Sequence, residues 1–165
     1  MYRIKISTKR FIIRTLNLKD INQTYLSWFT KKENYKYLNT IKKKQTLQSL
    51  KNFFLKKKKK KIFFCGIFLK KNNLHVGNIK FEPVNFNKKS TTLGIFIGNP
   101  EWRGKSCGYE CLRKIINFIN KKYSLNYFYL GVDKKNTRAT KLYTKLGFIK
   151  YEINKNSYKM VLKLI

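Results

Sequence analysis

The segment that decides the fold runs from Thr91 to Phe148 and reads TTLGIFIGNPEWRGKSCGYECLRKIINFINKKYSLNYFYLGVDKKNTRATKLYTKLGF. Its first eight residues place apolar side chains at alternate positions, which is typical of a strand. A basic loop at 99–108 follows and leads into a long helix with an apolar stripe. Residues 126–132 are expected to form a second strand, and residues 137–146 a short helix. This order predicts helices packed on one sheet.

The flanking sequence extends this sheet on both sides. Asn17 and Thr46 are expected to be the N-caps of two further helices, and Gly147 is expected to end the short helix as a left-handed cap. The pattern predicts an α/β (α+β) fold with a mixed central sheet of about six to seven strands and about four helices, all in one domain over residues 1–165. The expected strands are 10–16, 62–69, 75–82, 91–98, 126–132, 148–153 and 158–164.

The charge of the chain is extreme, with 39 Lys plus Arg, 7 Asp plus Glu and a net charge of +32 over 165 residues. Lysine, together with the abundant Asn, Ile, Phe and Tyr, is encoded by A/T-rich codons, so genome composition explains much of this charge. The field would nevertheless attract polyanions. A basic RNA- or DNA-binding domain is therefore the alternative function, supported by aromatics beside lysines at Tyr35, Tyr37, Phe53 and Phe54. The run Lys56–Lys61 is interpreted as a solvated helix end, or else as a patch for an anionic partner.

The cysteines and the N-terminus predict a cytoplasmic protein. Three cysteines without framework spacing indicate reduced thiols, and basic residues interrupt any apolar core of a signal peptide. The longest apolar run, Ile62–Leu69, is too short to span a bilayer. Cys107 and Cys111 lie four residues apart, but with only the distant Cys65 or His75 to complete a set, no metal site is expected.

The loop at 99–108 predicts a phosphate site. A helix that begins within it would expose unpaired backbone N–H groups and a partial positive charge. Gly104, Ser106 and Gly108 are small enough for a phosphate to approach the backbone, and Arg103 and Lys105 add charge. These residues favour a nucleotide-like diphosphate. Gly104-Lys105-Ser106 also matches the end of a P-loop motif, but the first glycine of that motif is out of register.

Three segments resemble the GNAT superfamily of N-acetyltransferases. WRGKSCGYE (102–110) is similar to its acetyl-CoA-binding motif [Q/R]-x-x-G-x-[G/A]. LGVDKKNTRATKLYTKLGF (130–148) is similar to the strand and helix that follow in this family, G-V-x-x-x-N-x-x-A-x-x-L-Y-x-K-x-G-F. TYLSWFTKKENYKYL (24–38) resembles the branch that contains ribosomal-protein-alanine and amino-sugar acetyltransferases, although Lys31-Lys32-Glu33 replaces the usual D-P-E.

The resemblance implies acetyl-CoA as co-substrate, held between the splayed strands 91–98 and 126–132. Backbone groups near Ile97 and Gly98 would pair with the pantetheine arm, and an N–H there would polarise the thioester carbonyl. Asn136 would contact the pantetheine amide, or would simply cap the helix after it. The residues expected to hold the diphosphate are Arg103, Gly104, Lys105, Ser106, Cys107 and Gly108.

One residue departs from the family motif, and one is implied in the chemistry. Ser106 stands where the family has its first motif glycine, and we expect this position to require only a small side chain. Tyr143 is implied as the general acid for the departing CoA thiolate, although its helical stripe fits core packing equally. By type, a tyrosine pKa near ~10 exceeds a thiol pKa near ~8.5, so a hydrogen bond to the thiolate is as plausible as full proton transfer.

The general base has few candidates, because the chain has seven acids. Glu82, beside the expected cofactor strand, is predicted first, followed by Asp133 and Glu101, then His75, with water as the remaining possibility. At pH 7 an α-amine is roughly 14% neutral and a lysine roughly 0.04%. The predicted acceptor is therefore a primary amine of low pKa, either a protein N-terminal α-amine or the amino group of a nucleotide-linked amino sugar. The expected assembly is a monomer or a homodimer.

Overall fold

The computed structural model describes residues 1–30, 32–37 and 44–164, and it contains one eight-stranded sheet in the order β1-β2-β3-β4-β5-β6-β8-β7. The α/β fold class is confirmed, with one strand more than expected. The additional strand is β1, a three-residue segment paired with β2 that is too short to show a periodic pattern. The strands are β1 Lys5–Ser7, β2 Phe11–Thr15, β3 Phe63–Leu69, β4 His75–Asn85, β5 Ser90–Ile97, β6 Tyr127–Asp133, β7 Ile149–Ile153 and β8 Ser157–Lys163.

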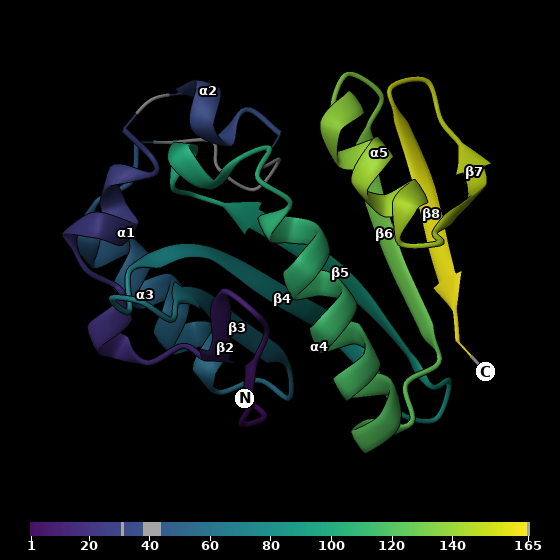
Figure 1. Cartoon of the computed structure of the whole chain (residues 1–165), viewed down its shortest axis with the longest axis horizontal. Coiled ribbons are helices and arrows are strands. Elements are labelled where there is room, and N and C mark those ends of the chain that lie inside the picture. The colour runs from purple at the N-terminus through teal and green to yellow at the C-terminus, as the bar shows by residue number, and fades with distance from the viewer. Residues whose placement is uncertain (31, 38–43, 165) are drawn as a thin grey trace.

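Helices cover both faces of the sheet (Figure 1). One core lies beneath α4 and α5, and a second lies beneath α1 and α3. Every residue of β3 is buried, because that strand is covered on both sides. The helices are α1 Gln23–Ser27, α2 Lys32–Tyr35, α3 Leu47–Lys58, α4 Cys107–Tyr123 and α5 Thr137–Lys145, with single 3-10 turns at Leu18–Asp20 and Pro100–Trp102.

The predicted helix ends are present, but the first predicted helix is broken. Asn17 and Asp20 form a capping box around one 3-10 turn. Asn22 then caps α1 by accepting a hydrogen bond from the Tyr25 N–H, so the expected continuous helix becomes two short pieces. Thr46 caps α3 as predicted, and Gly147 has a φ of 92°.

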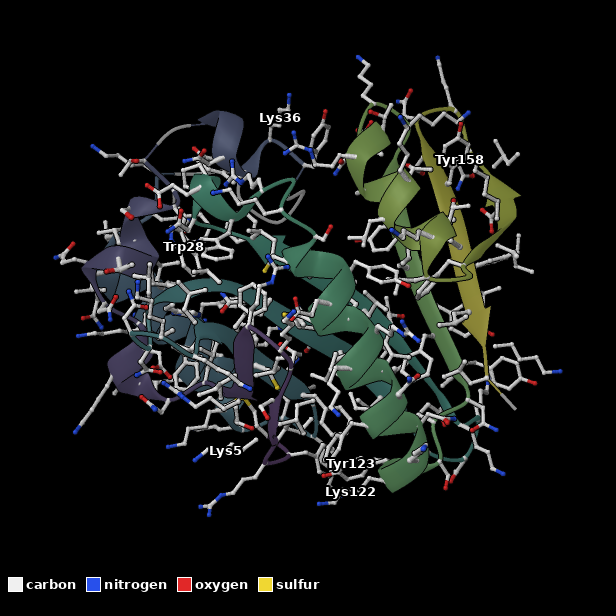
Figure 2. All side chains as sticks on the ribbon, viewed as in Figure 1. Lys5, Trp28, Lys36, Lys122, Tyr123 and Tyr158 are labelled. Carbon is white, nitrogen blue, oxygen red and sulfur yellow. The ribbon has the colours of Figure 1, made fainter. Side chains whose placement is uncertain are left out.

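The lysine run ends a helix, as expected. The helix α3 ends at Lys58, and the rest of the run leads towards β3. Figure 2 shows basic side chains such as Lys5, Lys36 and Lys122 extending outward from the molecule. Phe54, one of the aromatics beside lysines, is only 1% exposed, so it belongs to the core and offers no stacking surface for a base.

The sheet opens between β5 and β6, as the resemblance implied. These parallel strands pair only over Ser90–Thr92 and Tyr127–Tyr129, and then they diverge (Figure 1). Within the part of the chain that the structure describes, the edge of β5 that faces β6 has no strand partner from residue 93 to residue 97. Backbone groups along that edge are therefore available to a ligand.

Candidate active site

A cavity of about 1210 Å³ occupies the opening between β5 and β6. The first turn of α4, the inner side of α5 and residues 34–37 around the end of α2 complete its walls. The predicted residues among its lining are Ile97, Arg103, Gly104, Ser106, Cys107, Gly108, Asn136 and Tyr143. Among the described residues, the predicted Gly98, Lys105 and Glu82 lie outside the lining.

The loop before α4 presents a row of free donors. The first N–H of this region with an intrahelical partner is that of Glu110, which donates to the Ser106 carbonyl. In the described part of the chain, the backbone N–H groups of residues 104–109 make no hydrogen bond with the protein. Left-handed conformations at Gly104 (φ 79°) and Ser106 (φ 57°) reverse the chain so that the loop can deliver these groups. Such a concave set of N–H groups at a helix N-terminus binds phosphate.

Arg103 and Lys105 take different positions from those predicted. The Arg103 guanidinium donates to the carbonyls of Ile97 (2.9 Å) and Gly98 (3.0 Å) and to Asn34 Oδ1 (3.0 Å), so it joins the end of β5 to α2. The Lys105 ammonium lies 5.6 Å from the Trp102 ring centroid, and its residue is outside the cavity lining. The loop therefore offers an anion its backbone more than its basic side chains.

Gly98 serves the fold rather than the cavity. A β-carbon at this position would collide with the indole of Trp28, which packs directly on the glycine. Its carbonyl, like that of Ile97, already accepts a hydrogen bond from Arg103. Each carbonyl thus already has one hydrogen-bond donor, so a pantetheine arm that paired with it would share the oxygen with Arg103.

A long-range contact that the sequence did not reveal supports the loop. Arg10 donates from Nη2 to the Lys105 carbonyl (2.8 Å), and its Nε pairs with Glu110 (2.8 Å). The backbone N–H of Arg10 also donates to Glu110. One hundred residues separate Arg10 from Glu110, so no local pattern could have indicated this support.

Ser106 has the left-handed conformation, and the expectation that the position needs only a small side chain is wrong. Its φ of 57° carries a strain on the order of 1 kcal/mol for a residue with a β-carbon. Its side chain makes no capping hydrogen bond that would offset the strain.

We expect Ser106→Gly to raise the free energy of unfolding by about 1 kcal/mol in urea titrations. Ser106→Val should lower the free energy of unfolding. If the valine variant were more stable than the glycine variant, that result would contradict the backbone strain at this position.

Tyr143 and Asn136 both lie on the cavity. Tyr143 is 6% exposed and its phenol is in an apolar surrounding, so burial raises its pKa to about 12. Its ring packs 5.8 Å from that of Phe148. Asn136 caps α5, because its side-chain oxygen accepts from the Ala139 N–H at 3.2 Å. The capping role is thus observed, while a contact of Asn136 with a cofactor stays a prediction.

The structure does not bring Glu82 to the cavity. Its carboxylate pairs with Lys57 (2.6 Å), Lys80 (3.0 Å) and Lys60 (3.7 Å). Burial opposes ionisation of this group, but the hydrogen bonds from Lys57 and Lys80 outweigh it and lower the pKa of Glu82. The expectation that Glu82 is the base is therefore not supported, because Glu82 is outside the cavity lining and its Oε2 is paired with both Lys57 and Lys80.

Glu82→Gln should therefore affect stability more than catalysis. We expect a loss of about 2 kcal/mol in the free energy of unfolding, because partly buried lysines lose their counter-charge. The pH–rate profile of acetyl transfer should keep its shape. Glu101→Gln, at an exposed position outside the cavity lining, is the matched control. Loss of the acidic limb of the profile, where the rate rises as the base ionises, in Glu82→Gln alone would restore Glu82 as the base.

Of the remaining base candidates, Asp133 alone lines the cavity. One of its oxygens accepts from the Lys135 N–H at 2.7 Å. Glu101 lies in the exposed 3-10 turn before α4. His75 is buried among Phe68, Trp28 and Tyr25, and it lines a separate, smaller cavity beside Arg14 and Asp20.

Two glycines leave room on the face of the sheet opposite α4. Gly94 of β5 and Gly131 of β6 lie two residues beyond the last paired positions, Thr92 and Tyr129, so they are level with each other across the opening. A β-carbon on either would meet nothing within 4 Å. Asp133 follows on the same face of β6, since side chains alternate along a strand. The cavity therefore extends from the α4 N-terminus, between the strands, to an open space with one carboxylate.

Within residues 1–30, 32–37 and 44–164, no three His, Cys, Asp or Glu side chains are grouped so that they could hold a metal ion. The helices over the same residues are too short or too polar to cross a lipid bilayer.

The fold and site together define a class of protein, the acyltransferases whose mixed sheet opens between two parallel strands beside a phosphate-binding helix N-terminus. The chain belongs to the GNAT acetyltransferase family, because the model of the acetyltransferase (GNAT) domain matches residues 10–149. That match covers most of the chain and includes both motifs that carried the resemblance.

Solved structures agree with this assignment. The chain is similar to an acetyltransferase of the GNAT family from Bacillus anthracis, with 19% identity, a TM-score of 0.84 and coverage of 97% of this chain and 98% of that one. Spermidine N-acetyltransferase from Vibrio cholerae, in complex with CoA and spermine, has 17% identity, a TM-score of 0.81 and coverages of 93% and 95%. Ribosomal-protein-S5-alanine acetyltransferase from Vibrio fischeri has 16% identity, a TM-score of 0.77 and coverages of 97% and 96%. At these identities the likeness concerns the fold alone.

Proposed function

We propose that this protein transfers the acetyl group of acetyl-CoA directly to a primary amine, either a protein N-terminal α-amine or the amino group of a nucleotide-linked amino sugar. The observation that carries the proposal is the continuous cavity that joins the free N–H groups of residues 104–109 to the open space at Gly94 and Gly131. The two ends suit the two reactants. The phosphates bind at the helix N-terminus, and the amine approaches from the opposite face of the sheet.

The reaction needs little from acids and bases in this site. The neutral amine attacks the thioester carbonyl, a C–N bond forms, the C–S bond breaks, and the CoA thiolate leaves. The amine nitrogen loses a proton to water or to Asp133. An N–H group at the unpaired edge of β5 stabilises the negative charge on the carbonyl oxygen, and Tyr143 donates a hydrogen bond to the departing sulfur.

The charge of the cavity supports an acceptor that is not a polycation. Asp133 is the single carboxylate that lines the cavity within the described residues, whereas the basic lining residues are numerous. An acceptor with several ammonium groups would be repelled, while a phosphate-bearing sugar or an N-terminus with few charges would not. The basic lining residues are Lys36, Arg103, Lys135, Arg138, Lys141, Lys145 and Lys159.

Ligand-dependent melting tests the donor, and acetyl transfer tests the acceptor. Acetyl-CoA at a hundred times its Kd should stabilise the protein by about 2.7 kcal/mol, which corresponds to a rise in Tm of about 5–10 °C. Consumption of acetyl-CoA should then occur with peptide N-termini or amino-sugar nucleotides. An unchanged Tm together with salt-sensitive RNA or DNA binding would overturn the proposal in favour of the nucleic-acid-binding alternative.

A further inference from the structure

Three basic residues of α5 face the cavity without counter-charges. Arg138, Lys141 and Lys145 are exposed residues that line it. They are three and four residues apart, so they share one face of the helix. Among the described residues, none of the three is paired with a carboxylate. We call these residues the α5 basic stripe.

The α5 basic stripe lies against the first turn of α4. A β-carbon on Gly108 would be 3.0 Å from the Leu142 side chain, so glycine lets the two helices approach closely. The Lys145 ammonium lies 4.8 Å from the ring centroid of Tyr109, in that same first turn. Charges of one sign are therefore gathered beside the free N–H groups of residues 104–109.

The charge of Arg138 also reaches the other side of the cavity. Burial lowers the pKa of Arg103, and repulsion from Arg138 lowers it further. Since the Arg103 guanidinium is already hydrogen-bonded to the Ile97 and Gly98 carbonyls, it cannot turn away to relieve that repulsion. A bound anion beside Arg138 would relieve it.

We infer that the α5 basic stripe binds the 3′-phosphate of coenzyme A, and so makes the protein selective for CoA over 3′-dephospho-CoA. The backbone N–H groups of residues 104–109 are sufficient for the diphosphate. The stripe is a second, side-chain site at the edge of the same cavity, suited to a phosphate monoester of higher charge. The inference rests on the proposed use of acetyl-CoA, and it gives Arg138, Lys141 and Lys145 a different phosphate from the diphosphate that the sequence had suggested for Arg103 and Lys105.

Calorimetric titration of the whole chain with CoA and with 3′-dephospho-CoA tests the inference. In 50 mM salt the unaltered protein should bind CoA at least tenfold more tightly, and the preference should shrink as salt screens the charges. In R138Q/K141Q/K145Q the preference should fall below threefold, mainly through weaker CoA binding. Melting curves establish that the variant is folded, and each single substitution should reduce the preference in part.

The matched control removes the same charge from α3 and the residue after it. K56Q/K58Q/K59Q also lowers the net charge by three, at exposed positions outside the cavity lining, and it should keep the full preference. Equal binding of the two ligands by the unaltered protein, or a preference that survives in R138Q/K141Q/K145Q, would overturn the inference. Binding of neither ligand by the unaltered protein would instead overturn the proposed function, and the inference with it.

Discussion

Replacement of Tyr143 by phenylalanine is expected to lower kcat for acetyl transfer ten- to a hundredfold. The hydroxyl lies in the cavity wall on α5, and burial raises its pKa to about 12. Transfer of its proton to a thiolate whose conjugate acid has a pKa near ~8.5 would be uphill by about 5 kcal/mol. In the proposed mechanism the phenol therefore acts by a charge-assisted hydrogen bond to the thiolate, which would contribute about 1.5–3 kcal/mol in the transition state.

The effect of Tyr143→Phe should be confined to the chemical step. KM for acetyl-CoA is expected to change less than twofold, because the phosphates bind elsewhere in the cavity. The free energy of unfolding should change by less than about 1 kcal/mol, since the ring stays in the core. Tyr123→Phe, at the far end of α4 and outside the cavity lining, provides the control. An unchanged kcat in Tyr143→Phe would show that Tyr143 serves packing only.

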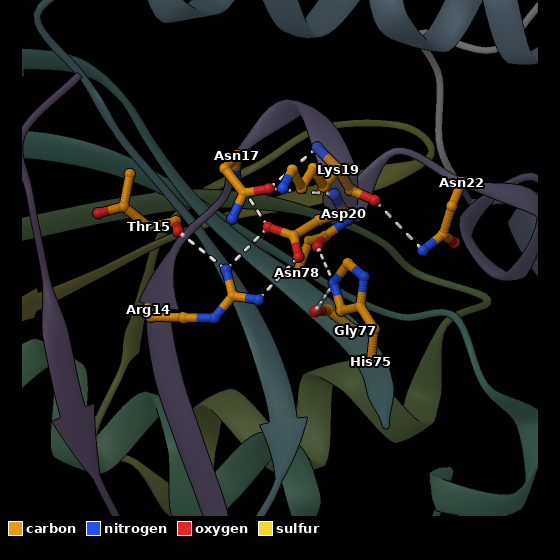
Figure 3. Close-up of polar contacts among 9 residues, drawn as sticks. All are labelled: Arg14, Thr15, Asn17, Lys19, Asp20, Asn22, His75, Gly77 and Asn78. Atoms are coloured by element: carbon orange, nitrogen blue, oxygen red, sulfur yellow. Dashed lines mark hydrogen bonds and ion pairs between the residues drawn. The ribbon is translucent and has the colours of Figure 1, made fainter. Parts of the chain in front are cut away.

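The second large effect concerns stability and the single histidine of the chain. His75 is 5% exposed, and burial lowers its pKa from an ordinary value of 6.5 to about 4. Its Nε2 lies 3.1 Å from the Gly77 carbonyl and 2.9 Å from Asn78 Oδ1, so Nε2 carries the proton of the neutral ring (Figure 3). Its Nδ1 is the one buried side-chain polar atom in the described residues that lacks a partner. Protonation of that nitrogen would bury a charge beside the apolar ring of Phe68.

The direction of the pH dependence follows from these two pKa values. His75 takes up a proton near pH 6.5 in the unfolded chain and only near pH 4 in the folded chain. Between these two pH values the unfolded state binds more protons, so a fall in pH stabilises the unfolded state relative to the folded state. The stabilisation is fully present above pH 6.5 and is lost as the pH falls towards 4. The free energy of unfolding should drop by about 2 kcal/mol between pH 7 and pH 5, and by about 3 kcal/mol at pH 4.

Urea titrations at several pH values measure this effect. The part of the slope between pH 7 and pH 5 that disappears when His75 is replaced belongs to this residue. His75→Gln should be less stable at pH 7 but should show almost no slope between pH 7 and pH 5. An equal slope in both proteins would contradict the assignment.

The sequence predicted the elements well wherever a pattern is local. The strands and α4 follow from periodicity, and the caps at Thr46 and Gly147 follow from side-chain and backbone preferences that act within four residues. The loop at 99–108 contains the start of α4, as predicted from the same kind of local signal, while its use as a phosphate site stays a prediction. The resemblance to GNAT acetyltransferases, carried by two motifs in this region, is confirmed by the family match.

The direction in which long charged side chains point could not be predicted. Lysine and arginine have several rotatable bonds and reach many partners, so their position in the chain does not decide their contacts. The Arg103 guanidinium donates to the carbonyls at the end of β5, and Arg10 forms an ion pair with Glu110, which is one hundred residues away in the sequence. Glu82 has a suitable carboxylate and lies on a strand next to β5, but it is outside the cavity lining and is paired with Lys57 and Lys80.

The sequence by itself thus determined the family, the sheet and the position of the helix N-terminus in the loop at 99–108, because these depend on neighbouring residues in the chain. Tertiary structure alone decided which charges reach the cavity. The divergence of β5 and β6 placed Asp133 on it and left Glu82 outside, and the packing of α5 on Gly108 brought Arg138, Lys141 and Lys145 to its edge. The chain has a net charge of +32, and its positive residues are spread along the whole sequence. Only the fold therefore decides which of these residues line the cavity.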